Sequence, residues 1–249
     1  MNEEDMTERL LLAAGVGPGS TVLDVGCGYG RVTQIAARLV GGQGRVLGLD
    51  RDASSLVVAR QRARELGLSN VSFAQGDLRL VPSEHGLFDV AVGRRVLMYQ
   101  SDAVAAVVGL ARAVRVGGVL VFQDLDSTMG PGRLTPLPLH ERVRSWIWTM
   151  LEREGADVHM GLHLPSVLED AGLSVEHVSC EAVVHTPKTP HRVGEMIRAI
   201  LPRIIESGVA TAEDIDVDTL DQRLAEELRS ANAAYISDVV VGAWARKLA

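Results

Sequence analysis

The stretch from Thr21 to Gly30 constrains the fold of this chain more than any other part of the sequence. Val22, Leu23 and Val25 form a short apolar run typical of a buried parallel strand, and three alternating glycines follow before helical spacing begins at residue 31. Glycines let the backbone turn sharply and approach a ligand without a Cβ atom in the way. Free N–H groups at the start of the next helix favour an anionic group. The stretch therefore predicts a strand, a ligand-binding turn and a helix.

Acidic residues end the next two predicted strands. Asp50 closes the apolar run 45–50, about twenty residues beyond the glycines, where a carboxylate can accept hydrogen bonds from ribose hydroxyls. Asp77 follows the run 71–75, where it could accept a hydrogen bond from an exocyclic adenine amine. The position of Asp50 fits either an adenosine ligand or NAD, and that of Asp77 favours the adenosine ligand.

Residues 24–30, Asp-Val-Gly-Cys-Gly-Tyr-Gly, resemble the first motif of the class I S-adenosylmethionine-dependent methyltransferases. A dinucleotide site would prefer Gly-x-Gly-x-x-Gly, and its last glycine would fall at position 31, which is Arg. The resemblance covers residues 8–125 well and the remainder in outline, and it is to the small-molecule type similar to the quinone-biosynthesis C-methyltransferase branch. It implies S-adenosyl-L-methionine as cofactor. The cofactor-binding residues that it implies are Asp24, Gly26, Gly28, Gly30, Asp50, Arg51, Gly76, Asp77, Leu78 and Gly93.

The order of predicted elements is that of an α/β protein. Predicted strands lie at about 21–26, 45–50, 71–75, 87–92 and 118–124, and predicted helices between them at about 31–41, 53–66 and 101–115. Such alternation predicts a doubly wound (Rossmann-like) parallel sheet that binds its ligand at the carboxyl ends of the strands. A sixth strand is expected near 173–184. A seventh strand is expected from Tyr235 to Lys247. The family resemblance implies that this strand lies antiparallel at the edge of the sheet, so we expect a mostly parallel seven-stranded sheet.

We expect one domain over residues 1–249, with a cofactor-binding core at about 8–125 and substrate-side cap elements at about 126–170 and 186–232. Helix 138–151 and the helices between 191 and 230 are expected to wall a largely apolar cavity that opens toward the methyl group of the cofactor. Relatives commonly carry more residues upstream, and the start of this chain is brief by comparison.

Methyl transfer from a sulfonium is an in-line displacement, so a base is needed only when the nucleophile must lose a proton. Asp126, His140 and Tyr99 are our candidate catalytic bases, because the substrate should lie over the carboxyl ends of strands four and five. Asp126 could instead cap a turn, and His140 could be a solvated first-turn residue. His140, Arg144 and Trp148 recur at i, i+4 and i+8, and this helix face either packs against a neighbouring helix or borders the substrate.

A metal site is not expected. His159 and His163 have the i, i+4 spacing of a metal-binding pair, but Gly161 lies between them and Pro165 follows, so a regular helix that presents both is doubtful.

Arg94 and Arg95 could hold a substrate carboxylate, although a charged pair after a strand is more often a solvated or salt-bridged surface. Cys27 lies near a helix start that favours a thiolate, but a small residue in a tight turn explains it adequately. Its separation from Cys180, with no signal peptide and no apolar run of transmembrane length, predicts a cytoplasmic protein with reduced thiols.

The formal net charge of −7 argues against nucleic acid and anionic membranes as partners. The polar-aromatic tetrapeptide of amino-group DNA methylases is absent after the fourth strand, at residues 92–95. We therefore expect a small organic acceptor of specialised metabolism, methylated at oxygen or carbon rather than nitrogen, and a homodimer stays open. The alternatives are a cofactor-binding protein of the same fold that catalyses a non-methylating reaction or is inactive, and, more remotely, an NAD-dependent oxidoreductase.

Overall fold

The computed structural model describes residues 3–130, 132–189 and 193–248, which divide into two compact units. Unit 1 comprises residues up to Leu125, His159–Glu181 and the chain from Val240 onward. Unit 2 comprises Asp126–Val158 and Ala182–Val239.

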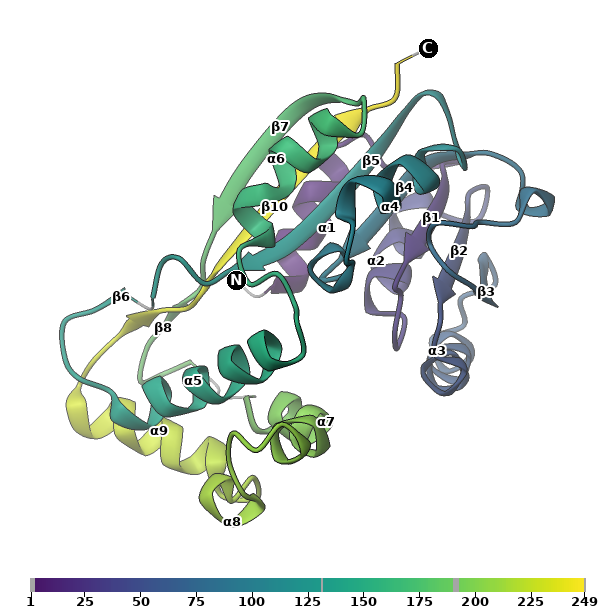
Figure 1. Cartoon of the computed structure of the whole chain (residues 1–249). Coiled ribbons are helices and arrows are strands. Elements are labelled where there is room, and N and C mark those ends of the chain that lie inside the picture. Colours follow the sequence, from purple (N-terminus) through teal and green to yellow (C-terminus); the bar gives the residue numbers. More distant parts are fainter. Residues whose placement is uncertain (1–2, 131, 190–192, 249) are drawn as a thin grey trace. The chain divides into compact units, whose positions relative to one another are not determined.

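A seven-stranded sheet forms the centre of unit 1 (Figure 1), with the strand order β3-β2-β1-β4-β5-β10-β7. The strands are β1 Thr21–Val25, β2 Arg45–Asp50, β3 Val71–Gln75, β4 Phe88–Arg94, β5 Val114–Asp126, β7 Ser174–Glu181 and β10 Val239–Arg246. The first five strands pair in parallel. β10 runs antiparallel to β7. The predicted doubly wound sheet with an antiparallel last strand is confirmed.

The last strand does not lie at the sheet edge, where we expected it. β10 is inserted between β5 and β7, and β7 forms the edge. The backbones of Gly117 and Lys247 bond across the β5–β10 boundary, and Val241 of β10 pairs with Cys180 of β7. Inside the sheet β10 pairs on both sides, whereas an edge strand leaves one row of N–H and C=O groups unpaired.

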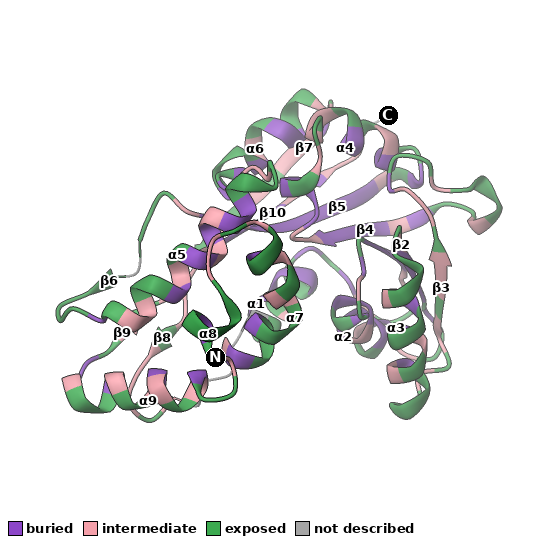
Figure 2. Ribbon diagram, turned by 60° about the horizontal axis from the view of Figure 1, so that its bottom comes forward, coloured by how far each residue is buried: buried purple, intermediate pink, exposed green. Residues whose placement is uncertain are grey.

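The helices of unit 1 are α1 Glu3–Ala13, α2 Arg31–Val40, α3 Ala53–Glu65, α4 Ala103–Ala111 and α6 Met160–Asp170, with 3₁₀ turns η1 Ser83–His85 and η2 Leu97–Tyr99. α1 and α2 pack their apolar side chains against alternate residues of β1, β2, β4 and β5. Burial of each large aliphatic side chain there contributes about 1.5–3 kcal/mol. Figure 2 shows the central strands mostly buried and the outer side of α3 exposed.

Two predicted helix boundaries differ in the structure. The helix predicted to reach residue 115 ends at Ala111, because β5 already begins at Val114, which pairs with Phe88. Residues 165–172 read in the sequence as a helix ended by Gly172, but in the structure this helix begins at Met160. Pro165 therefore lies inside this helix and does not start it.

Unit 2 contains α5 Pro138–Arg153, α7 Val193–Glu206, α8 Ala212–Ile215 and α9 Leu220–Ala231, and an antiparallel sheet in the order β6-β9-β8. Its strands are β6 Gly132–Arg133, β9 Tyr235–Ile236 and β8 Val184–His185. α5, α7 and α9 pack on one another. Within the described ranges, no helix combines the length and apolar character that crossing a membrane requires.

Candidate active site

The glycine turn after β1 has one side open to a ligand. Gly26, Gly28 and Gly30 all have positive φ, at 64°, 49° and 79°. A Cβ atom at Gly26 would lie 2.6 Å from the Cγ2 atom of Val96, whereas one at Gly28 would meet nothing within 4 Å. Gly26 is therefore required by packing as well as by its backbone conformation. Gly28 is the glycine whose backbone faces open space.

Asp50, at the end of β2, lies against this turn. Its Oδ2 atom accepts a hydrogen bond of 2.7 Å from the amide of Gly28, and its Oδ1 atom accepts one of 2.9 Å from the amide of Asp52. The carboxylate is thus held beside the open side of the turn, where hydroxyl groups of a sugar could reach its oxygens.

Asp24, at the end of β1, is almost fully buried. Its Oδ2 atom accepts a hydrogen bond of 2.5 Å from the hydroxyl of Thr33 in the first turn of α2. Burial raises the pKa of Asp24 to about 7, against the lowering effects of the Thr33 hydrogen bonds and the Arg94 charge. This carboxyl group changes its charge near neutral pH.

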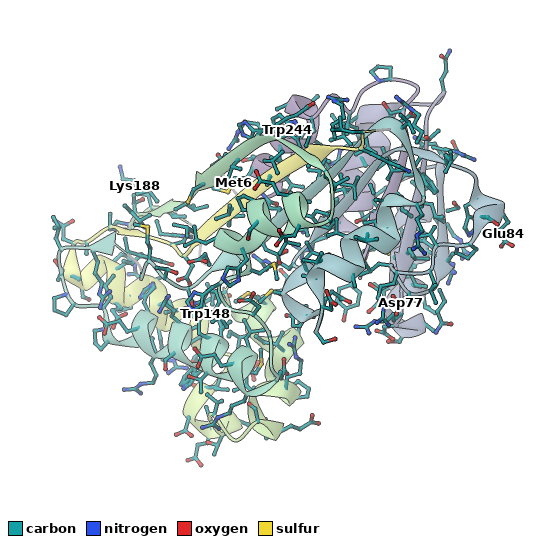
Figure 3. The ribbon with its side chains drawn as sticks, turned by 45° about the horizontal axis from the view of Figure 1, so that its top comes forward. Met6, Asp77, Glu84, Trp148, Lys188 and Trp244 are labelled. Carbon is teal, nitrogen blue, oxygen red and sulfur yellow. The ribbon has the colours of Figure 1, made fainter. Side chains whose placement is uncertain are left out.

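Asp77, labelled in Figure 3, follows β3 and is held by Arg79. The Nε and Nη2 atoms of Arg79 donate to its two carboxylate oxygens at 3.0 and 2.7 Å. These hydrogen bonds lower the pKa of Asp77 to about 2. Asp77 is therefore ionised at neutral pH, and an adenine amine would share its oxygens with the arginine.

The other residues proposed for the cofactor lie at the ends of β2, β3 and β4. The amide of Gly76 donates to the Asp50 carbonyl, the Arg51 carbonyl accepts from Gln75, and Leu78 is buried. Gly93 pairs with Val25 of β1. A Cβ atom at Gly93 would lie 2.6 Å from Val96 and 2.9 Å from Phe122, so packing alone requires this glycine.

The carboxyl edge of the sheet in unit 1 thus offers an open glycine backbone, one carboxylate beside it and a second one beyond β3. This donor and acceptor set fits a nucleoside that carries an amino-acid chain. A family model described as a methyltransferase domain matches residues 17–172, more than half of the chain. The chain belongs to the class I S-adenosylmethionine-dependent methyltransferases. Its cofactor is S-adenosylmethionine.

An arsenite methyltransferase of Aquipseudomonas alcaligenes is 37% identical over 122 residues, which cover 46% of this chain and 35% of that protein. The ubiquinone/menaquinone biosynthesis C-methyltransferase UbiE of Pseudomonas savastanoi pv. phaseolicola is 37% identical over 117 residues, which cover 45% of this chain and 44% of that protein. This methyltransferase chain therefore spans less than half the length of these two relatives.

The crystal structure of BH2331, assigned as a methyltransferase of Bacillus halodurans C-125, matches with a TM-score of 0.65 and 18% sequence identity. The match covers 98% of this chain and 100% of that one. At this level of identity it shows the likeness of the fold.

The three candidate bases lie in different surroundings. Tyr99 ends η2 in unit 1 and is 42% exposed. Asp126 is fully buried, and its Oδ1 atom accepts a hydrogen bond of 2.8 Å from the amide of Thr128. His140, in the first turn of α5, forms a pair with Glu227 of α9, with 2.6 Å between its Nδ1 atom and Oε2. His140 is therefore not a solvated residue, because only 9% of its side chain is exposed.

Glu227 also caps the amino end of α5. Its two oxygens accept from the amides of Leu139 at 2.8 Å and His140 at 3.1 Å. Although burial alone would raise it, the hydrogen bonds from His140 and from the two amides keep the pKa of Glu227 below its ordinary value. Glu227 is thus a carboxylate at neutral pH, so the Nδ1 atom of His140 carries the proton. In a neutral imidazole the Nε2 atom is then the acceptor.

The rest of this face of α5 is bound to the segment before β10. The Nε atom of Arg144 lies 2.5 Å from Oδ1 of Asp238, and the indole Nε1 of Trp148 donates to Oδ2 at 3.2 Å. Arg144 also lies over the Trp148 ring, 5.6 Å from its centroid. Trp148 therefore packs inside unit 2, but its polar partner is a loop carboxylate and not a neighbouring helix.

The signals that we discounted have local structural explanations. His159 is the N-cap residue of α6, and its carbonyl accepts from the amide of His163. No three His, Cys, Asp or Glu side chains are grouped as a metal ion would require in the described ranges. Burial raises the pKa of the Cys27 thiol far above its usual range, so the thiolate is disfavoured.

A cavity of about 410 Å³ lies at the opposite, amino-terminal edge of the sheet. It is lined in part by Asp89, Arg115 and Arg246. Both arginines are in ion pairs, Arg115 with Asp89 and Arg246 with Glu176. The cofactor motifs are at the other edge, so we assign this cavity no part in the reaction.

Sequence reasoning missed Glu227, Thr33 and Arg79. Thr33 and Arg79 carry a weak local signal, since each lies within a few residues of a motif that was identified. Glu227 lies 87 residues from His140, and no local pattern connects the two.

Proposed function

We propose that this chain transfers a methyl group from S-adenosylmethionine to a small organic acceptor, at an oxygen or a carbon atom. The observation that carries the proposal is the contact of the Asp50 carboxylate with the Gly28 amide, which brings the ribose acceptor and the open glycine backbone together. Gly26, Gly30 and Gly93 would shape the turn, and Asp24 and Asp77 would meet the amino-acid and adenine ends.

When bound, the cofactor supplies a sulfonium with an electrophilic methyl group and a good leaving group. The protein then has to position the acceptor and to take up a proton where the acceptor has one to lose. We propose His140 as the base, with Glu227 fixing its tautomer so that the Nε2 atom can receive the proton. Asp126 and Tyr99 are the second and third candidates. The Thr128 amide bond gives Asp126 a local role as a turn cap, and Tyr99 is nearly half exposed.

The names of the two relatives point to different acceptors, since one names arsenite and the other names C-methylation in ubiquinone/menaquinone biosynthesis. Soft thiolate ligands suit a thiophilic acceptor. This chain has two cysteines, and Cys27 is buried in the glycine turn while Cys180 lies on the edge strand β7. This cysteine content favours an organic acceptor over a metalloid.

The net charge of −7 supports a small molecule over nucleic acid. We place the reaction in specialised metabolism and in the cytoplasm, where both thiols stay reduced.

Calorimetry with S-adenosylhomocysteine, the demethylated cofactor, tests the first half of the proposal, and NADH is the control ligand. We expect heat from the former and none from NADH; the opposite result would favour the oxidoreductase. The second half is tested by screening phenols, enols, acids and amines for transfer of labelled methyl. Cofactor binding with no transfer to any of these classes would favour the non-methylating alternative.

A further inference from the structure

A layer of polar side chains lies at the carboxyl ends of β1, β4 and β5, on the sheet face that α1 and α2 cover. The members from the strands are Asp24, Arg94 and Gln123. Two residues earlier on each strand, Val22, Val92 and Val121 belong to the apolar core under α1 and α2. Since side chains alternate along a strand, the three polar residues point to this same face.

Helix α1 contributes Thr7 to the layer. Its hydroxyl donates to Oε1 of Gln123 at 2.6 Å and accepts from Nη1 of Arg94 at 3.1 Å. Thr7 is 1% exposed and Gln123 is 4% exposed. The hydroxyl of Thr7 thus links the guanidinium of Arg94 to the side chain of Gln123, and this contact with the amino-terminal helix holds the guanidinium in position.

Asp24 and Arg94 place opposite charges on neighbouring strands. Asp24 pairs in register with Val92, so Arg94 lies one strand over and two residues further toward the edge. The Arg94 charge also opposes the rise in the pKa of Asp24 that burial causes. An amino acid is a zwitterion whose two charged groups share one carbon atom, and an acid and a base on neighbouring strands, which lie about 4.8 Å apart, offer each of those groups a partner of opposite charge.

We propose that Arg94 binds the α-carboxylate of the methionine part of S-adenosylmethionine, with Thr7 and Gln123 as the residues that position its guanidinium. Asp24 then faces the ammonium group of the same ligand. Arg94 immediately follows Gly93 at the end of β4, and Asp24 precedes Gly26 by two residues, so both lie at the carboxyl ends of neighbouring strands, the edge at which the glycine turn begins. A guanidinium matches a carboxylate with two parallel N–H donors, which a lysine cannot reproduce.

This inference deepens the cofactor assignment on which the proposed function rests. The competing interpretation is that Arg94 only neutralises Asp24 inside the fold. Only if Arg94 binds the carboxylate should its replacement weaken a ligand that has the amino-acid part and spare a ligand that lacks it. The test therefore compares the affinities of one variant for two such ligands.

Calorimetry measures how each substitution changes the affinities for two ligands, S-adenosylhomocysteine and 5′-methylthioadenosine. The second ligand keeps the adenosine and the thioether but has no carboxylate. For Arg94→Gln we expect the affinity for S-adenosylhomocysteine to fall about 10- to 100-fold, as loss of charge-assisted hydrogen bonds does. The affinity for 5′-methylthioadenosine should change less than about twofold. Arg115→Gln, which removes the same charge at the opposite edge of the sheet, should change neither.

Equal weakening of both ligands, or no weakening of either, would overturn the proposal. Arg94→Lys keeps a charge beside Asp24 and serves if the glutamine variant does not fold. Arg94→Lys should bind S-adenosylhomocysteine several-fold more weakly than the wild type does, with its affinity for 5′-methylthioadenosine retained. If the ratio of these two affinities is the same as in the wild type, the result would also count against Arg94. Thr7→Val, which keeps the shape of the threonine but removes its hydroxyl, should shift the ratio in the same direction by a smaller factor. Failure of the wild-type chain to bind S-adenosylhomocysteine would instead contradict the proposed function.

Discussion

The carboxylate of Glu227 lies 2.6 Å from the Nδ1 atom of His140 and at the same time caps the helix that carries this histidine. One side chain of α9 therefore fixes both the position of the α5 amino end and the tautomer of the imidazole. His140 also contacts Tyr235, whose ring lies edge-on to the imidazole at 4.8 Å and stacks parallel to the ring of His185 at 4.7 Å.

Glu227→Gln should lower kcat about 10- to 100-fold, because an amide can donate to Nδ1 and no longer fixes the tautomer that makes Nε2 the acceptor. The variant should also lose about 1 kcal/mol of stability through the weaker helix cap. Kinetics over a pH series, with a thermal melt, measure both effects. His140→Gln should reduce kcat at least as much and leave S-adenosylhomocysteine affinity unchanged. Full activity of His140→Gln would transfer the role of base to Asp126 or Tyr99.

Asp50→Asn should weaken S-adenosylhomocysteine binding about tenfold or more, since a charged acceptor beside the ribose contributes about 1.5–3 kcal/mol. Asp52→Asn is the matched control, because its carboxylate caps α3 through the amides of Ser54 and Ser55 and is not proposed to touch the cofactor. The Asp52→Asn variant should have a lower melting temperature, because its helix cap is weaker, and an unchanged affinity for S-adenosylhomocysteine. The reverse pattern in calorimetry would show that the ribose acceptor has been misassigned.

Cofactor affinity should rise with pH between about 6 and 8 through ionisation of Asp24, whose pKa is raised to about 7 by burial. The ammonium of the ligand binds the ionised form. Titrations of S-adenosylhomocysteine at several pH values check this, and Asp24→Asn should bind weakly with a flatter profile. A wild-type profile as flat as that of the asparagine variant would exclude Asp24 from the binding step.

Ionisation of Asp24 should also change the stability of the fold, which should fall as pH rises, whereas the cofactor affinity rises. Between pH 4 and 7 the folded protein keeps the Asp24 proton that the unfolded chain has already lost, so the contribution of this group to stability falls as pH rises through that window. The melting temperature of Asp24→Asn, relative to wild type, should therefore increase from pH 4 to pH 7. A constant difference between the two proteins would contradict the raised pKa.

Gly26→Ala and Gly28→Ala should fail in different ways. Both residues have positive φ, which costs an alanine about 1–2 kcal/mol. Gly26→Ala adds a clash with Val96, so it should be the less stable variant in thermal unfolding. Gly28→Ala puts a methyl group into the open space of the turn, and its main effect should be loss of S-adenosylhomocysteine affinity. Full affinity in folded Gly28→Ala would mean that no ligand approaches the backbone there.

Local patterns in the sequence determined the fold class and predicted most of the proposed cofactor site. The glycine turn requires backbone conformations that only glycine adopts easily, and strand length and helix length fix how far Asp50 and Asp77 follow it. Because parallel strands end at one edge of their sheet, the order of elements alone brings these carboxylates together. The resemblance to class I methyltransferases depends on the same short-range features, and the family match confirms it.

Only the tertiary structure decided which partners these residues have. Glu227 meets His140 across 87 residues, and Thr7 meets Gln123 across 116. β10 enters the sheet between β5 and β7, although its own sequence describes merely an apolar strand. Such contacts are made when elements distant in the chain pack against one another, and neither periodicity nor motif spacing encodes the choice of partner. The sequence by itself therefore predicted where the cofactor binds, and packing decided which side chains surround the residues of that proposed site.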